Sequence, residues 1–145
     1  ARIMNIYEGT SQLQVVAAIN GVTKGTFMEQ ISRYEEQAYT EAMQPIVEKM
    51  KALRARVEAM VAHVEAVSKE APQFKDFHAR RLVESVGHII ITYLLAHQAS
   101  EVEEYAADAK VFAKLAEAYI IGAEAYVMNS TADDVALISQ VQEQF

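Results

Sequence analysis

The feature that most constrains the fold is an apolar repeat in the middle of the chain. From Ile46 to Val67, apolar residues return at alternating steps of four and three, at Ile46, Met50, Leu53, Val57, Met60, Val64 and Val67. This spacing is typical of an α-helix with one buried stripe, and the charged residues between these positions are typical of its solvated face. The repeat predicts a long amphipathic helix whose stripe is covered by neighbouring elements.

The first part of the chain also follows helical spacing, and glycine and proline residues divide it. Thr10 is a good N-cap for a helix that ends at Gly21, which leaves residues 21–25 as a short linker. Thr26 is a second N-cap candidate. The helix behind it is expected to end before Pro45 or to be kinked by it, because proline has no N–H and clashes with the preceding turn.

Beyond the central repeat, Pro72 occupies a position that a first helical turn tolerates, and it leads into the apolar segment 86–95. That helix is hydrophobic on most of its circumference, so we expect it to be central. A further long helix is expected from about Val102 to Met128, and Thr131 can cap a last short helix. No strand alternation is sustained. The sequence therefore predicts an all-α, up-down bundle of about four main helices with short terminal helices.

Composition narrows the classes of function. The 145 residues carry a formal net charge of -7, and the one basic cluster, residues 49–56, is interleaved with apolar positions, so we expect no nucleic-acid binding. Segment 86–95 is far shorter than the roughly 20 residues of a membrane span. The absence of cysteine favours a reducing compartment, the cytoplasm. Because the chain opens at Ala1 without an initiator methionine, we expect it to be part of a longer protein.

The candidate for catalysis lies near the start of the chain, in the run Tyr7-Glu8-Gly9-Thr10. Glu8 stands in a turn, and Gly9 beside it has no side chain to obstruct a substrate. A carboxylate placed in a dry pocket can act as a base, because burial raises its pKa. The alternative is an ordinary helix start, in which Glu8 is a solvated acid near the favourable end of the helix dipole.

The contiguous segment 6–14, Ile-Tyr-Glu-Gly-Thr-Ser-Gln-Leu-Gln, together with its lead-in at residues 2–5, resembles the catalytic turn and last helix of FAD-dependent acyl-CoA dehydrogenases. The resemblance implies α,β-dehydrogenation of an acyl-CoA thioester, with Glu8 as the base that removes the α-proton. FAD accepts the hydride, and an electron-transfer acceptor reoxidises it. Substrate contacts are implied for Tyr7 and Gly9. FAD contacts are implied for Thr10, Ser11 and Gln12, where free N–H groups at a helix start suit polar cofactor atoms.

The part after Gly25 is similar to the helical domain appended to longer members of this family. The resemblance therefore divides the chain into residues 1–25, the end of the dehydrogenase helical domain, and residues 26–145, an appended bundle that serves packing and assembly. One departure is clear: the family commonly has an arginine soon after the Gln-x-x-Gln stretch, whereas this chain has Val15, Val16 and Ala17. The rest of the flavin and substrate site would lie upstream, so we expect the isolated chain to be inactive and to carry no FAD.

A metal site and a non-catalytic helical module are two other interpretations of the sequence. The histidines His63, His78, His88 and His97 do not form the paired Glu-x-x-His motif of a di-iron bundle, so we expect no metal site. The chain could also be a non-catalytic helical module for oligomerisation or partner docking. If the upstream dehydrogenase domains are missing, Val15, Val16 and Ile19 lose part of their normal cover, and we expect them to pack against another copy of the chain in a homo-oligomer.

Overall fold

The computed structural model describes Ile19 and residues 21–143, and this part of the chain is helical with no strand. The all-α prediction is confirmed. The helices are α2 (Thr26–Glu35), α3 (Gln44–Ser68), α4 (Gln73–Glu101), α5 (Ala106–Asn129) and α6 (Ala132–Glu143). Short 3-10 turns at Glu41–Met43 and Glu103–Tyr105 precede α3 and α5.

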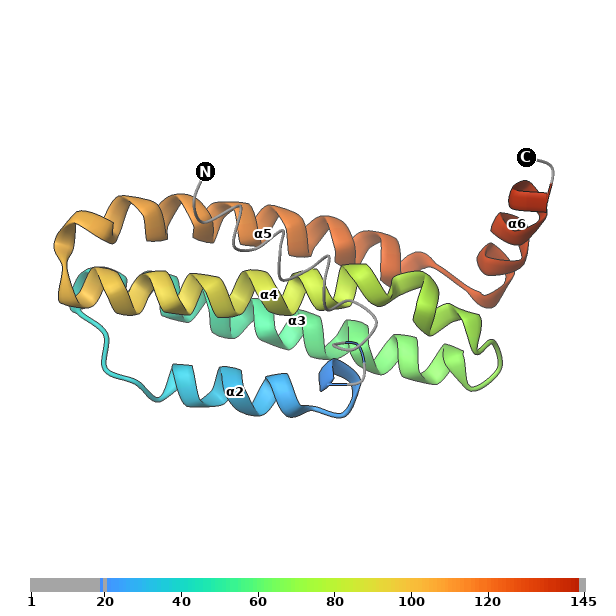
Figure 1. Ribbon diagram of the computed structural model, residues 1–145, viewed down its shortest axis with the longest axis horizontal. Helices are drawn as coiled ribbons and strands as arrows, with labels where there is room; N and C mark the ends of the chain where they lie inside the picture. The colour runs from blue at the N-terminus through green and yellow to red at the C-terminus, as the bar shows by residue number, and fades with distance from the viewer. Residues whose placement is uncertain (1–18, 20, 144–145) are drawn as a thin grey trace.

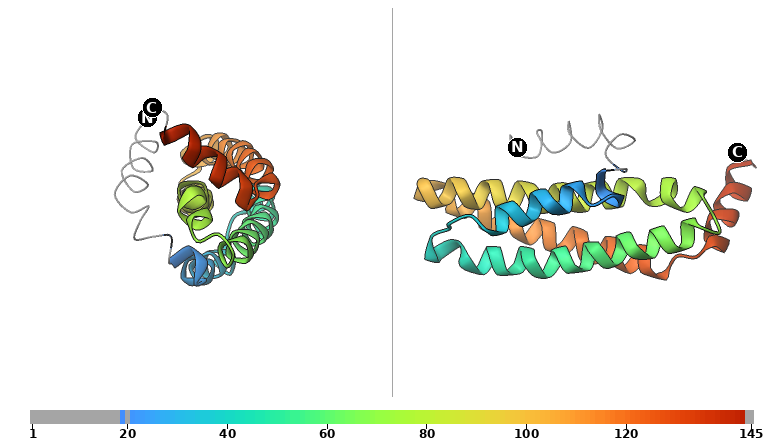
Figure 2. Two further views of the ribbon diagram at one scale, coloured as in Figure 1. Left: turned by 90° about the vertical axis from the view of Figure 1, so that its right-hand side faces the viewer. Right: turned by 90° about the horizontal axis from the view of Figure 1, so that it is seen from below.

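The three long helices, α3, α4 and α5, run up and down beside one another (Figure 1). The shorter α2 lies along the opposite edge of the bundle from α5, and α6 turns away at the end where α5 finishes (Figure 2). Short connections between long amphipathic helices favour this antiparallel order.

The apolar repeat of the sequence forms the buried stripe of α3. Six of its seven positions are buried, and Val67 at the last turn is partly buried. Pro45 lies in the first turn of α3, where the absent N–H costs no hydrogen bond, so it begins this helix and does not kink the preceding one.

The helix α4 is central, as its sequence predicts. It contacts α2, α3, α5 and α6, and it buries fourteen residues spread around its circumference. The largest of these include Phe74, Leu82, Ile89 and Tyr93, all with no exposed surface. Burial on nearly every side explains why its sequence shows an apolar run and no clean stripe.

Two helix boundaries differ from those that the sequence predicts: the end expected at Gly21 and the N-cap expected at Thr26. Residues 21–23 are helical, so Gly21 does not end the preceding helix, and the turn comes at Lys24 and Gly25. A Cβ on Gly21 would lie 2.7 Å from the ring of Phe27, so this glycine allows a close approach instead. Gly25 adopts a left-handed φ of 85° and is the N-cap of α2, which makes Thr26 the first helical residue and not the cap.

The last two helices differ in how well their starts are predicted. The helix expected from Val102 begins four residues later, because Val102 is extended and a 3-10 turn follows it. At α6 the expected start is confirmed: the N–H of Thr131 donates to Oδ2 of Asp134 at 2.7 Å, one half of a capping box. Among the described helices, none combines the length and apolar character that a bilayer crossing requires.

Candidate functional site

The residues expected to form the catalytic site lie outside the described part of the chain. These are the base Glu8, the substrate contacts Tyr7 and Gly9, and the FAD contacts Thr10, Ser11 and Gln12. Their roles stay predictions. The structure does show how the bundle holds α2, the helix that follows this segment, and what the remaining polar side chains do.

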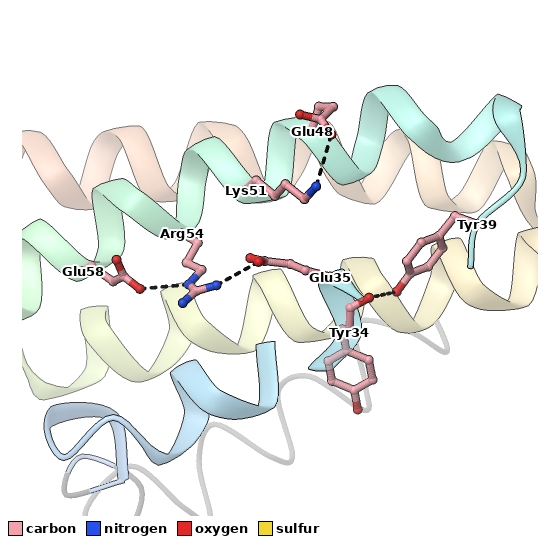
Figure 3. Close-up of polar contacts among 7 residues, drawn as sticks. All are labelled: Tyr34, Glu35, Tyr39, Glu48, Lys51, Arg54 and Glu58. Carbon is pink, nitrogen blue, oxygen red and sulfur yellow. Dashed lines mark hydrogen bonds and ion pairs between the residues drawn. The ribbon is translucent and has the colours of Figure 1, made fainter. Parts of the chain in front are cut away.

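An ion pair between α2 and α3 anchors the end of α2 (Figure 3). Nη1 of Arg54 lies 2.8 Å from Oε2 of Glu35, and Nε of the same arginine lies 2.8 Å from Oε1 of Glu58. The hydrogen bond with Glu35 raises the pKa of Arg54, which holds the guanidinium in its charged form. Because the side chain of Glu35 is only 16% exposed, loss of Arg54 would leave a largely buried charge without its partner.

Three tyrosines pack where α2 meets α4. The ring of Tyr93 lies 6.1 Å from the rings of both Tyr34 and Tyr39, and Oη of Tyr39 donates to the main-chain oxygen of Tyr34 at 2.7 Å (Figure 3). Burial raises the pKa of Tyr39 to about 12 and also raises the pKa of Tyr93. The phenols of Tyr39 and Tyr93 therefore stay neutral at physiological pH, and the ring contacts hold α2 against α4.

A second polar cluster braces α4 against α5. Oη of Tyr119 donates to Oε2 of Glu84 at 2.5 Å, and Arg80 pairs with the other carboxylate oxygen at 3.4 Å. Nδ1 of His88 lies 2.7 Å from the main-chain oxygen of Glu84, and the imidazole stacks on Tyr119 at 4.5 Å. Burial lowers the pKa of His88 and keeps it neutral. Glu84 and His88 do share a helix face, and both side chains contact Tyr119.

A third cluster closes the end of the bundle near α6. His78 has no exposed surface, and the rings of Phe74 and Phe77 meet it edge-on at 4.6 Å each. Neither ring nitrogen of His78 has a hydrogen-bond partner, and burial lowers its pKa to about 4. Beside it, the Arg81 guanidinium lies 4.3 Å from the centre of the Tyr126 ring, a cation–π contact between α4 and α5.

Within the described residues, no three histidine, aspartate or glutamate side chains are grouped so as to hold a metal ion. The buried hydroxyls of Ser85, Thr92 and Ser130 donate to main-chain oxygens of their own helices, four residues back. These three hydroxyls therefore serve the bundle itself, and the polar groups described above do not form a cluster that would fit a flavin.

The sequence predicts a solvated face for the charged residues of α3, and the structure shows that several of them pair with residues of other helices. Lys49 pairs with Glu117 of α5 at 3.4 Å, and Arg56 pairs with Glu124 at 2.6 Å. Lys49 and Arg56 are seven residues apart on α3, and Glu117 and Glu124 are seven residues apart on α5. This matching heptad spacing of opposite charges is a sequence signal that could have predicted the two contacts. The pairing of Glu35 with Arg54 has no such signal.

Comparison with known proteins identifies the bundle. A family model described as acyl-CoA dehydrogenase C terminal matches residues 23–135. The chain belongs to this family. It is also similar to the crystal structure of an acyl-CoA dehydrogenase family protein from Porphyromonas gingivalis, with a TM-score of 0.72 and 29% identity over 79% of this chain and 97% of that chain. Among curated proteins, no sequence matches the chain.

The range that matches the acyl-CoA dehydrogenase C-terminal family begins just before α2 and ends in α6, so it includes all three polar clusters. Because the likeness covers nearly all of the Porphyromonas chain, that solved chain is little longer than the bundle. The relationship points to an oxidoreductase as the parent protein.

Proposed function

We propose that the chain is the C-terminal part of an enzyme that dehydrogenates an acyl-CoA thioester between its α and β carbons. The observation that carries the proposal is the family match over residues 23–135, directly behind the segment Tyr7-Glu8-Gly9-Thr10 that resembles a dehydrogenase catalytic turn. Two independent parts of the chain thus favour the same family. FAD, when bound in the complete enzyme, supplies the hydride acceptor.

In this proposal the chain contributes one edge of the active site. The Glu8 carboxylate takes the α-proton of the acyl group, and the missing side chain of Gly9 lets the thioester approach. Tyr7 lines the substrate side of the turn. The helix start at Thr10, Ser11 and Gln12 offers N–H groups to polar atoms of the cofactor. The rest of the site belongs to residues upstream of Ala1.

Residues 26–145 act in this proposal as a packing and assembly domain. The polar clusters support that role, because each one braces helix against helix: Glu35 with Arg54, Tyr119 with Glu84, and Arg81 with Tyr126. The bundle would hold α2, and with it the segment that carries Glu8, in a fixed position relative to the enzyme body. Placement of this kind matters, since small displacements of a catalytic group slow a reaction strongly.

The test is anaerobic mixing of the complete flavoprotein with saturated acyl-CoA thioesters of several chain lengths. We expect the yellow flavin absorbance to bleach, with formation of the 2-enoyl-CoA. The 145-residue chain alone is expected to purify colourless and to form no product, because it holds only one edge of the site. A complete protein that keeps its flavin oxidised with every acyl-CoA would contradict the proposal and leave the non-catalytic interaction module as the function.

A further inference from the structure

The helix α5 is apolar on both sides, although only one side is buried. Its inner face packs on α3 and α4 through Ala109, Phe112, Ala113, Ala116, Ile120, Ala123 and Val127. Five of the ten large hydrophobic side chains that are exposed in the described part also belong to α5: Val111, Leu115, Ile121, Tyr126 and Met128. Exposed apolar side chains that gather on one helix indicate an interaction surface.

Part of this surface forms a regular seam, which we call the outer face of α5: Val111, Leu115, Ala118, Gly122 and Ala125. The steps are four, three, four and three, the spacing of a helix that packs against another helix. A Cβ on Gly122 would have no atom within 4 Å, so the middle of the face is open. In Figure 1 α5 forms the edge of the bundle away from α2.

We propose that the outer face of α5 binds the same face of a second copy of this chain, with the two helices antiparallel. The proposal rests on the packing role given above and names the partner for it. It does not depend on the dehydrogenase chemistry, which is tested by flavin reduction and not by association.

The sizes of the side chains favour a second copy in this orientation. The larger residues, Val111 and Leu115, lie in the first half of the face, and the small residues Ala118, Gly122 and Ala125 lie in the second half. When two such helices pack antiparallel, each large residue meets a small one, and the two-fold axis passes near Ala118. In a parallel pair, large residues would meet large ones and glycine would meet glycine, which leaves a gap.

The charges beside the face favour the same arrangement. Lys110 and Lys114 stand in the first half of α5, and neither has an ion-pair partner within the described part of the chain. Glu117 and Glu124 stand on the same side in the second half, where they already pair with Lys49 and Arg56 of α3. An antiparallel partner brings the lysines of one copy toward the glutamates of the other.

Cross-linking tests the orientation cleanly, because the chain contains no cysteine. Ala118→Cys places a thiol near the two-fold axis, so a short bis-maleimide should join two copies. Val111→Cys should not cross-link to itself, because an antiparallel pair centred near Ala118 separates the two positions by about 21 Å along the axis. Ala59→Cys, at an alanine that is also exposed but lies on α3, is the matched control. Cross-linking through Val111→Cys, or equal yields at Ala59 and Ala118, would overturn the proposal.

Sedimentation of the 145-residue chain tests the fit of the surfaces. Gly122→Leu makes the face more apolar, yet it fills the space that a partner's Val111 or Leu115 occupies. We expect its dimer dissociation constant to rise about tenfold or more, as for other central contacts of an interface. Circular dichroism should show an unchanged bundle, because nothing lies near that position. Stronger association of Gly122→Leu would indicate nonspecific adhesion and refute the proposal.

The charge contribution is tested separately with Lys110→Glu combined with Lys114→Glu. The double variant should dimerise several-fold more weakly at low salt, and the difference from the wild-type chain should shrink as salt screens the charges. A wild-type chain that stays monomeric at every concentration would overturn the proposal.

Discussion

The core of α3, α4 and α5 and the attachment of α2 are held in different ways. Side chains with no exposed surface fill the three-helix core, among them Met50, Met60, Leu82, Ile89 and Ile120. Within Thr26–Glu35, only Ile31 is buried. The helix α2 packs on the core through Ile31 and the partly buried Phe27 and Met28, and it is also held by the ion pair of Glu35 with Arg54 and by the stacked rings of Tyr34 and Tyr93.

The difference indicates two levels of stability in one bundle. Apolar burial contributes in proportion to area and needs no exact geometry, so the core should unfold as one unit. A partly buried ion pair contributes little beyond its desolvation cost, but it fixes one orientation. The helix α2, which joins residues 1–25 to the bundle, is therefore positioned by specific contacts. It should unfold locally at a lower free energy than the three-helix core.

The largest expected effect lies in the core. Ile89→Ala removes a side chain that is fully buried in α4, and it should lower the free energy of unfolding by about 2–5 kcal/mol. Leu94→Ala, on an exposed part of the same helix, is the control and should cost less than about 1 kcal/mol. Urea titration followed by circular dichroism measures both. Equal losses would mean that α4 is not the centre of the core.

The next effect concerns the attachment of α2. Arg54→Met keeps the aliphatic stem but leaves Glu35 without its partner, and the free energy of opening α2 should fall by about 1–3 kcal/mol. Hydrogen exchange should rise in α2 and change much less in α5. Lys51→Met removes an exposed pair with Glu48 and should have little effect. An equal rise in hydrogen exchange in α2 and α5 would contradict the difference in stability between α2 and the core.

A pH effect is expected at the α6 end of the core. The pKa of His78 is lowered from 6.5 to about 4 by burial, with smaller contributions from Arg81 and His63, so the unfolded chain takes up this proton first as the pH falls. Stability should therefore decrease from pH 6.5 to about pH 4, by up to about 1.4 kcal/mol per pH unit for this group.

His78→Leu removes that proton site and should reduce the slope of the free energy of unfolding against pH. Part of the slope should remain, because the pKa of His88 is also lowered. His97→Gln, on an exposed part of α4, should not flatten it. Urea titrations at a series of pH values give the slopes. Identical slopes for wild type and His78→Leu would show that the buried imidazole does not control acid stability.

The smallest effect compares one substitution at two glycines. Gly122→Ala adds a methyl group to an open helical position and should stabilise the bundle by about 0.5–1 kcal/mol, measured at low protein concentration. Gly21→Ala should destabilise it, because the new Cβ would lie 2.7 Å from Phe27. Thermal unfolding reports both signs. A stabilising Gly21→Ala would show that Phe27 moves aside without cost.

The sequence predicts the three-helix core better than the attachment of α2, for a physical reason. The stripe of α3 and the apolar run of α4 are local patterns, and each one determines its own burial. The helix boundaries at Gly21 and Thr26 depend on Phe27 and on the left-handed turn at Gly25, which composition alone does not distinguish.

Polar contacts between residues far apart in the chain are the features that the sequence predicts least well. Glu35 and Arg54 are 19 positions apart, and Glu84 and Tyr119 are 35 apart, so nothing local indicates that they meet. The catalytic segment was recognised from its own residues, and the division of the chain at residues 25 and 26 rests on resemblance. Both stay predictions, since the segment around Glu8 lies outside the described residues.

The most direct test of the proposed function is the substitution Glu8→Gln in the complete enzyme. Glutamine keeps the shape of the side chain and removes its basicity, so the protein should fold and hold its flavin normally. Flavin reduction by acyl-CoA in an anaerobic rapid-mixing experiment should slow by about 10²–10⁴ or more, the usual contribution of a general base. A fully flavinated Glu8→Gln enzyme that reduces its flavin at nearly the wild-type rate would show that Glu8 is not the base.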